Sequence, residues 1–338
     1  MPAPQPDPPG SGTPDFDILG IGNAVLDVVA PVEEGFLARH DMFKGTMTLV
    51  EQADAEALYA AMPPGQESSG GSAANTCAWA AGLGARVAYL GKVAEDVLGT
   101  VFRHDIEAAG VHFPSSPLQG GEPSARCLVL VTPDGQRTMA VYLGAAVAFG
   151  EADIDADLIA RAAVTYLEGY LFDPPSAQAA FRRAARIARR AGRQVALSLS
   201  DPFCVDRHRA AFRELLGSVD VLFANEAEIS SLYEVADFAA AATAARRDVA
   251  LAVLTRSEQG SRILRGAETV EVAAEPARVL DTTGAGDAYA AGFLAAYTAG
   301  RDLATCGRLG SVAAAEVIGH YGARPQADLR AMRRAVLG

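Results

Sequence analysis

The feature that most constrains the fold is a regular alternation of short aliphatic segments with Ala- and Arg-rich segments. Six segments have the composition of buried strands: Asp17–Gly22, Arg86–Gly91, Val164–Leu167, Gln194–Leu199, Val219–Ala224 and Val249–Thr255. Eight segments read as helices: Ser72–Leu83, Val97–Ala109, Ser176–Ala191, Arg209–Leu216, Glu226–Tyr233, Ala236–Arg247, Gly286–Ala299 and Leu303–Ile318. Apolar strands separated by helices are typical of a mostly parallel sheet with helices on both faces. The sequence therefore predicts a doubly wound α/β fold.

Two regions interrupt this alternation and predict a small second sheet. Thr46–Val50 reads as a strand, and Ser124–Thr132 and Arg137–Leu143 read as a hairpin joined by a Pro-Asp-Gly-Gln turn. We expect a β lid built from residues 31–50 and 121–145. Residues 15–30, 51–120 and 146–338 would form the large domain, and the proline-rich residues 1–14 a disordered tail.

Composition limits the partners and the compartment. The formal net charge of −12 disfavours nucleic acid and anionic membranes as partners, because both would repel the average surface. The four cysteines stand far apart without a C-x-x-C pair, which favours reduced thiols in a cytosol. The first residues lack the pattern of a signal peptide, and no apolar stretch approaches the length of a membrane span. We expect a cytoplasmic protein.

A glycine-rich run, DTTGAGD at positions 281–287, stands directly before a predicted helix of small residues. Gly284, Ala285 and Gly286 leave backbone N–H groups uncovered where the helix dipole favours an anion. Asp287 falls in the first turn, where it can accept the proton of a hydroxyl that attacks a phosphate held there. An isolated G-x-G-D would indicate only a tight turn followed by a helix-start carboxylate.

The longer run DTTGAGDAYAAGF resembles the signature of the PfkB/ribokinase-like carbohydrate and nucleoside kinases. GGSAANT at 70–76 resembles the other signature of that family, a glycine turn into a helix that contacts the acceptor sugar. GNAVLD at 22–27 resembles its first strand and exit. A dinucleotide-binding reading of Gly20-x-Gly22 would need a third glycine and a later acidic residue, so a nicotinamide-dependent dehydrogenase stays a remote alternative. The resemblance implies an ATP-dependent kinase whose catalytic residues are Asp287 and the Gly284–Gly286 turn, and whose substrate is bound by Asn23, Asp27, Gly70, Gly71, Ser72, Asn75 and Arg137. Taken alone, Ser72 would be an ordinary N-cap and Arg137 an edge-strand charge.

The resemblance also implies a nucleotide and metal site. Its N-x-x-E element matches Asn225–Glu228, with Glu228 organising Mg²⁺ through water and Glu226 as the fallback. ATP would contact Asn225, Thr255, Gly260, Thr283, Gly284 and Gly286, although Arg256 and Ser257 depart from the usual glycine there. Many relatives bind K⁺ near the position of Asp281, so a K⁺ site there is a further expectation. His320 is a candidate for stacking on the nucleotide base.

The acceptor class follows from the same resemblance. The motifs are closer to adenosine-kinase-like members than to the ribokinase or phosphofructokinase branches, which makes adenosine the leading substrate. Another purine nucleoside, a sugar or a sugar phosphate is the alternative. Phe43, Tyr142 and Phe172 are candidates for stacking on the acceptor base, though such aromatics are often core residues. A catalytically silent binding module is a remote alternative, and the protein is expected to be a monomer or a homodimer through the lid.

Overall fold

The computed structural model describes residues 13–338, so the predicted tail at 1–14 lies almost wholly outside the described residues. The chain forms a nine-stranded sheet with the order β14-β13-β12-β11-β10-β9-β1-β5-β6. The pairs from β6 to β12 are parallel, and β13 and β14 complete the edge as an antiparallel hairpin. The strands are β1 Phe16–Ile21, β5 Val87–Leu90, β6 Val111–His112, β9 Ala162–Glu168, β10 Gln194–Ser198, β11 Val221–Asn225, β12 Leu251–Thr255, β13 Ser261–Arg265 and β14 Glu268–Val272. The predicted doubly wound α/β fold is confirmed.

Helices cover both faces of this sheet, and each face has its own apolar core. One core gathers side chains from α3, α4, α10, α11 and α12, and the other from α5 to α9. The central strands β5, β1, β9, β10, β11 and β12 are buried on both faces, which explains why they read as nearly continuous apolar runs. The helices are α3 Ser72–Gly82, α4 Val97–Ala108, α5 Ala156–Ala160, α6 Pro175–Arg190, α7 Pro202–Leu216, α8 Glu226–Tyr233, α9 Phe238–Asp248, α10 Ala285–Thr298, α11 Leu303–Val317 and α12 Leu329–Leu337.

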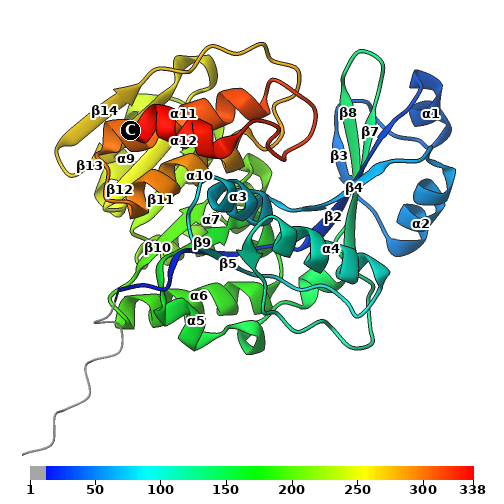
Figure 1. The fold of residues 1–338 in the computed structure, drawn as a ribbon, viewed down its shortest axis with the longest axis horizontal. Helices are drawn as coiled ribbons and strands as arrows, with labels where there is room; N and C mark the ends of the chain where they lie inside the picture. The colour runs from blue at the N-terminus through cyan, green and yellow to red at the C-terminus, as the bar shows by residue number, and fades with distance from the viewer. Residues whose placement is uncertain (1–12) are drawn as a thin grey trace, which may run out of the picture.

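A second sheet of five strands, here called the lid, stands beside the large sheet (Figure 1). Its order is β3-β8-β7-β2-β4, and α1 and α2 pack on its outer face. The elements of the lid are β2 Val25–Pro31, α1 Glu34–Arg39, β3 Met47–Leu49, α2 Gln52–Ala61, β4 Gln66–Gly70, β7 Ala125–Val131 and β8 Arg137–Tyr142. The strands predicted at 46–50, 124–132 and 137–143 are therefore present.

The predicted boundary of the lid was wrong in two places. Residues 25–30 and 66–70 were assigned to the large domain, but they form β2 and β4 of the lid sheet, and α2 packs there as well. Because β2 follows β1 after only three residues, it reads as the exit of that strand. The sequence of β4, QESSG, lacks the β-branched residues that usually mark a strand, and it forms by pairing with β2.

The two sheets together place loops and helix starts around one opening. The parallel strands β9 to β12 end at its floor, α3 and α10 begin there, and the lid closes one side. In open α/β sheets, ligands bind outside the carboxyl ends of the strands. None of the helices between residues 13 and 338 is long and apolar enough to cross a membrane.

Candidate active site

A cleft of about 1940 Å³ lies between the lid and the carboxyl ends of the large sheet. The lid contributes an apolar wall that includes Val25, Val129, Met139 and Val141. Polar and charged residues from β9, β10, α3 and α10 line the opposite side. A single small-molecule pocket typically measures about 300–1,000 Å³, so this cleft has room for a nucleotide and an acceptor together.

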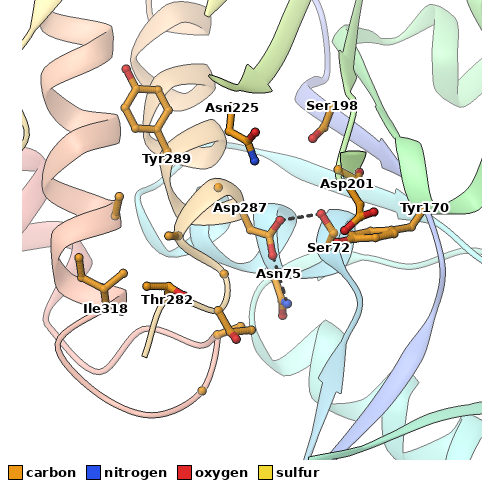
Figure 2. Close-up of a pocket in the computed structure, with 18 of the residues that line it drawn as sticks. Ser72, Asn75, Tyr170, Ser198, Asp201, Asn225, Thr282, Asp287, Tyr289 and Ile318 are labelled. Atoms are coloured by element: carbon orange, nitrogen blue, oxygen red, sulfur yellow. Dashed lines mark hydrogen bonds between the residues drawn. The ribbon is translucent and has the colours of Figure 1, made fainter. Parts of the chain in front are cut away.

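Asp287 lies where the starts of α3 and α10 meet (Figure 2). The Ser72 hydroxyl donates a hydrogen bond to Asp287 Oδ1 at 2.6 Å, and Asn75 Nδ2 lies 3.5 Å from Asp287 Oδ2. Asn75 Oδ1 is buried and has no hydrogen-bond partner among the described residues. The two glycine motifs of the sequence are thus brought together, with an unpaired acceptor beside the carboxylate.

Burial raises the pKa of Asp287 to about 6, although the hydrogen bonds from Ser72 and Asn75 oppose the change. Burial likewise raises the pKa of Asp27 to about 6, while the cations Arg324 and Arg137 lower it. A carboxyl group whose pKa lies near the working pH is suited to accept a proton and release it again. Asp287 has that property and lies in the cleft.

The turn before α10 has the geometry expected of an anion site. Gly284 is the N-cap, with φ of 75° and no side-chain cap on the helix. A Cβ at Gly284 would lie 2.8 Å from the Cβ of Ala323, so glycine is required by both space and backbone conformation. Around Gly286 a Cβ would meet nothing within 4 Å, which leaves the helix start open to the cleft. Ala285 and Thr283 also line it.

The second glycine turn, which joins β4 of the lid to α3, packs against Asp27 of β2 and against Asn23. A Cβ at Gly70 would lie 2.2 Å from Asp27 Oδ2, and one at Gly71 would lie 2.1 Å from the Asn23 carbonyl oxygen. Gly71 also has a φ of 95°. These close contacts leave no room for a side chain at either position, which explains why both residues are glycine. Asp27 and Ser72 line the same cleft.

Glu168, at the end of β9, was not predicted from the sequence. Its Oε1 accepts hydrogen bonds from the Asn23 backbone N–H at 3.2 Å and from Asn23 Nδ2 at 3.0 Å, and its Oε2 accepts from Ala73 N–H at 2.7 Å. A Cβ at Gly22 would lie 2.3 Å from Glu168 Oε2, so the glycine of the apparent dinucleotide motif makes room for this carboxylate. Burial raises the pKa of Glu168 to about 7.

Asn225 and Glu228 form a closed capping box at the start of α8. Glu228 accepts hydrogen bonds from the Asn225 backbone N–H at 2.9 Å and from Asn225 Nδ2 at 2.6 Å, and its own N–H donates to Asn225 Oδ1 at 2.9 Å. Glu228 is buried and lines the cleft, and burial raises its pKa to about 7. Glu226, the fallback, instead lies 3.5 Å from Arg256 Nε.

Thr255 ends β12, and Gly260 closes the turn after it. Gly260 has a φ of 79°, and a Cβ there would lie 2.0 Å from the Val272 carbonyl oxygen. Arg256 stands where the resemblance predicts glycine. Its side chain stacks on the Phe238 ring, with Cζ 4.2 Å from the ring centroid. Thr255, Ser257 and Gly260 line the cleft, so this departure leaves the turn in place.

Arg137 of the lid forms a buried ion pair with Asp281, to which its Nη2 donates a hydrogen bond. The Asp281 carboxylate also accepts hydrogen bonds from the backbone N–H groups of Thr283 and Gly322, both at 3.0 Å. Asp281 thus joins the lid to the glycine turn before α10. A K⁺ ion at this carboxylate would have to compete with the guanidinium of Arg137.

The aromatic residues proposed for base stacking lie elsewhere. Phe43 is exposed outside the cleft, Tyr142 bonds to Glu122, and Phe172 stacks on Phe212 in the core. His320 lies 3.2 Å from Glu316 Oε2 and does not line the cleft. Phe172 and Tyr142 are buried away from the cleft, so these two assignments were wrong, whereas base stacking by Phe43 or His320 stays a prediction. The aromatic residues that do line the cleft are Tyr170, Phe203, Phe223, Tyr289 and Tyr321. Tyr170 lies beside Asp201 and Ser72 in Figure 2.

Arg324 is a second functional candidate that the sequence reasoning missed. Its Nε and Nη2 donate to the carbonyl oxygen of Ser69 at 3.0 and 2.5 Å, directly before the Gly70–Gly71 turn. The motif Gly-Ala-Arg-Pro was visible in the sequence, but its contact with a residue 255 positions away was not.

The comparisons with known proteins agree with this geometry. Residues 48–329 match the pfkB family of carbohydrate kinases. The chain belongs to this family, and it is a phosphotransferase of the ribokinase-like fold.

Two solved structures cover nearly the whole chain. The adenosine kinase of Sinorhizobium meliloti is 51% identical, with a TM-score of 0.88 over 95% of this chain and 99% of that one. A probable sugar kinase of Rhizobium etli is 46% identical, with a TM-score of 0.89 over 96% of this chain and 99% of that one. The nucleoside kinase of Methanothermobacter thermautotrophicus is 29% identical over 90% of each chain. The relatives support a kinase of a ribose-containing substrate.

Proposed function

We propose that this protein transfers the γ-phosphate of ATP to the 5′-hydroxymethyl group of adenosine. The observation that carries the proposal is the meeting of the acceptor turn and the phosphate turn at Asp287, where Ser72 of α3 donates to a carboxylate of α10. A hydroxyl bound between these helix starts lies within reach of both a base and an anion site.

Asp287 accepts the proton of the acceptor hydroxyl as its oxygen attacks the γ-phosphorus, and the bond between that phosphorus and the β–γ bridging oxygen breaks. The start of α10 stabilises the negative charge on the transferred group through its N–H groups and dipole. Asp27 and Asn75 line the cleft, where the Asp27 carboxylate would accept hydrogen bonds from the vicinal hydroxyls of the ribose. Positioning and charge stabilisation supply most of the rate.

The donor set at the end of β11 suits Mg²⁺ that is bound through water. Both Glu228 oxygens accept hydrogen bonds from Asn225, yet the carboxylate lines the cleft. No group of three His, Cys, Asp or Glu side chains in residues 13–338 is arranged to ligate a metal directly. Mg²⁺ commonly keeps several waters and is held partly by substrate phosphates, whose charge it neutralises. Glu228 would hold those waters.

The choice of adenosine rests on the cleft as well as on the relatives. Tyr170 presents a partly exposed ring on the cleft wall next to Ser72, and the lid supplies an apolar wall. An aromatic ring and aliphatic side chains suit a purine base, and a plain sugar has no base to pack against them. Another purine nucleoside, or a sugar or sugar phosphate, is the second candidate, favoured by the likeness to the Rhizobium etli kinase.

The test is ADP release by purified protein with ATP, Mg²⁺ and one acceptor at a time: adenosine, inosine, guanosine, cytidine, ribose or fructose 6-phosphate. We expect the highest kcat/KM with adenosine and loss of acceptor-dependent release in Asp287→Ala. Activity with a sugar alone would refute the adenosine assignment and retain the kinase mechanism. No acceptor-dependent release from folded wild-type protein would refute the proposed function.

A further inference from the structure

The short C-terminal segment 321–324 contacts both halves of the cleft. On the phosphate side, Gly322 N–H donates to Asp281 Oδ2 at 3.0 Å, and Ala323 packs directly against Gly284. On the acceptor side, Arg324 donates two hydrogen bonds to the carbonyl oxygen of Ser69. A segment of four residues therefore spans the distance between the turn that holds phosphate and the turn that holds the acceptor.

The guanidinium of Arg324 uses two of its three nitrogens to bind Ser69. Nε and Nη2 share the Ser69 carbonyl oxygen, Nη2 also contacts Ser69 Oγ, and Nη1 is buried without a partner among the described residues. Asp105 of α4 accepts from the Ser69 backbone N–H at 2.8 Å and from Ser69 Oγ at 2.5 Å. Ser69 is thus held from two sides.

Ser69 controls the position of the acceptor site through its neighbours. It pairs with Leu26 in the lid sheet, and the next residue, Gly70, packs against the carboxylate of Asp27. Gly71 then passes the chain into α3, whose first residue is Ser72. A shift of the Ser69 carbonyl would move Asp27 and Ser72 relative to Asp287.

We infer that Arg324 is a positioning residue, which fixes the acceptor turn 69–72 relative to the phosphate turn 284–286 through Ser69 and the segment 321–324. This inference rests on the proposed function, because it assigns the two turns to acceptor and phosphate. Arg324 acts through Ser69 and takes no part in the proton transfer. The carbonyl needs two converging N–H donors, which lysine does not supply.

The charge of Arg324 provides a second, separable effect. Arg324 lowers the pKa of Asp27 and of Asp287, against the burial that raises both. Other charged or titratable groups that face these carboxylates or Arg324 come from separate elements, and the Arg324 variants leave them unchanged: Arg137 on β8, Asp105 on α4, Cys77 on α3, Cys127 on β7, Tyr166 and Glu168 on β9, Tyr170 directly after β9 and Glu228 on α8. Removal of the Arg324 charge should therefore raise the pKa of both carboxyls and move the acid limb of the pH–activity profile to higher pH.

The chain contains its own reporter for this segment. Trp79 is the only tryptophan, it is fully buried, and its Nε1 donates to the Ala323 carbonyl oxygen at 2.8 Å. Its fluorescence can report adenosine binding without turnover. The variants are Arg324→Gln, which removes both fork and charge, Arg324→Lys, which retains the charge, and Arg334→Gln, an exposed arginine of α12, as the matched control.

We expect Arg324→Gln to raise KM and Kd for adenosine by about tenfold or more, with KM for ATP changed less than about threefold, because a small misplacement of reacting groups is costly. The acid limb of kcat/KM should move to higher pH in Arg324→Gln but stay in place in Arg324→Lys, whose adenosine KM should still rise. Arg334→Gln should match wild type.

The inference would be overturned if Arg324→Gln and Arg334→Gln had the same KM for adenosine and the same acid limb of kcat/KM. If Arg324→Gln does not fold, Arg324→Lys decides: a wild-type adenosine KM and Kd in that variant would refute the positioning role. Failure of the proposed function is distinct, since it would appear as wild-type protein without acceptor-dependent ADP release.

Discussion

The Ser72 hydroxyl and the Asp287 carboxylate are joined by a 2.6 Å hydrogen bond, although 215 positions separate the two residues in the chain. Ser72 is the first residue of α3, and Asp287 lies in the first turn of α10. Both helix starts follow glycine turns, so two local motifs form one site only when α3 and α10 pack together. Their packing is among the most extensive contacts between helices of the large domain.

The raised pKa of Asp287 predicts an acid limit to activity. Since the carboxylate must be ionised to accept a proton and its pKa is about 6, kcat/KM should fall about tenfold per pH unit below that value. A pH profile with non-titrating substrate analogues measures this limb. A limb near the ordinary pKa of an aspartate would contradict the assignment of Asp287 as the base.

Asp287→Asn should reduce kcat by a factor of about 10² to 10⁴ with little change in affinity for ATP, because it removes the base and keeps the shape.

The Asp287→Asn variant should also unfold at a higher temperature than wild type at pH 8. A carboxyl with a raised folded-state pKa contributes stability at low pH and loses it as pH rises through about 6. The gain should vanish below about pH 4, where the carboxyl is protonated in both states. A lower melting temperature at pH 8 would contradict this reading.

The glycines on either side of Ala285 should respond differently to a methyl group. Gly284→Ala should cost about 1–2 kcal/mol or more of stability, because its φ is positive and Ala323 fills the space. Gly286→Ala should fold like wild type and raise KM for ATP, since its Cβ would enter the open cleft. Thermal unfolding and ATP titration distinguish the two, and equal effects on stability would refute this explanation.

The buried pair Arg137–Asp281 should show strong coupling. Removal of either partner leaves a buried charge, so Arg137→Ala and Asp281→Ala should each cost about 3–5 kcal/mol. The double variant should cost clearly less than the sum. Urea unfolding of the four proteins completes the cycle, and additive losses would show that the pair does not join the lid to the phosphate turn.

The sequence predicted the elements that have strong local patterns. The six predicted strands of the large sheet and the eight predicted helices are present, because their apolar periodicity reflects burial on the sheet faces. The strand β4 and the hairpin β13–β14 were missed, since Gln66–Gly70 is polar and Glu268–Val272 lies at a charged edge.

The candidate site was predictable only where a residue belongs to a local motif. Ser72, Asp287 and their glycines stand in such motifs, and the structure brings them together. Glu168 ends an apolar strand and Arg324 follows a loop. Neither belongs to a local motif, and their hydrogen-bond partners, Ala73 and Ser69, are far away in the sequence. The stacking candidate Phe172 was misplaced because the exposure of a ring depends on distant elements: Phe172 is buried, whereas Tyr170, two positions earlier, is exposed.

The interleaving of the lid with the large domain has a consequence for how the chain is made. Strand β2 pairs with β7 over its whole length, Val25 with Ala125 through Pro31 with Val131, and the intervening chain contains α3, β5 and α4 of the large domain. During synthesis, β2 and β4 therefore leave the ribosome well before β7 and β8 exist, and β2 exposes an unpaired, apolar edge during that interval. The lid completes its sheet only after part of the large domain has been synthesised, so truncation before residue 125 should yield aggregating chains and not a smaller folded unit.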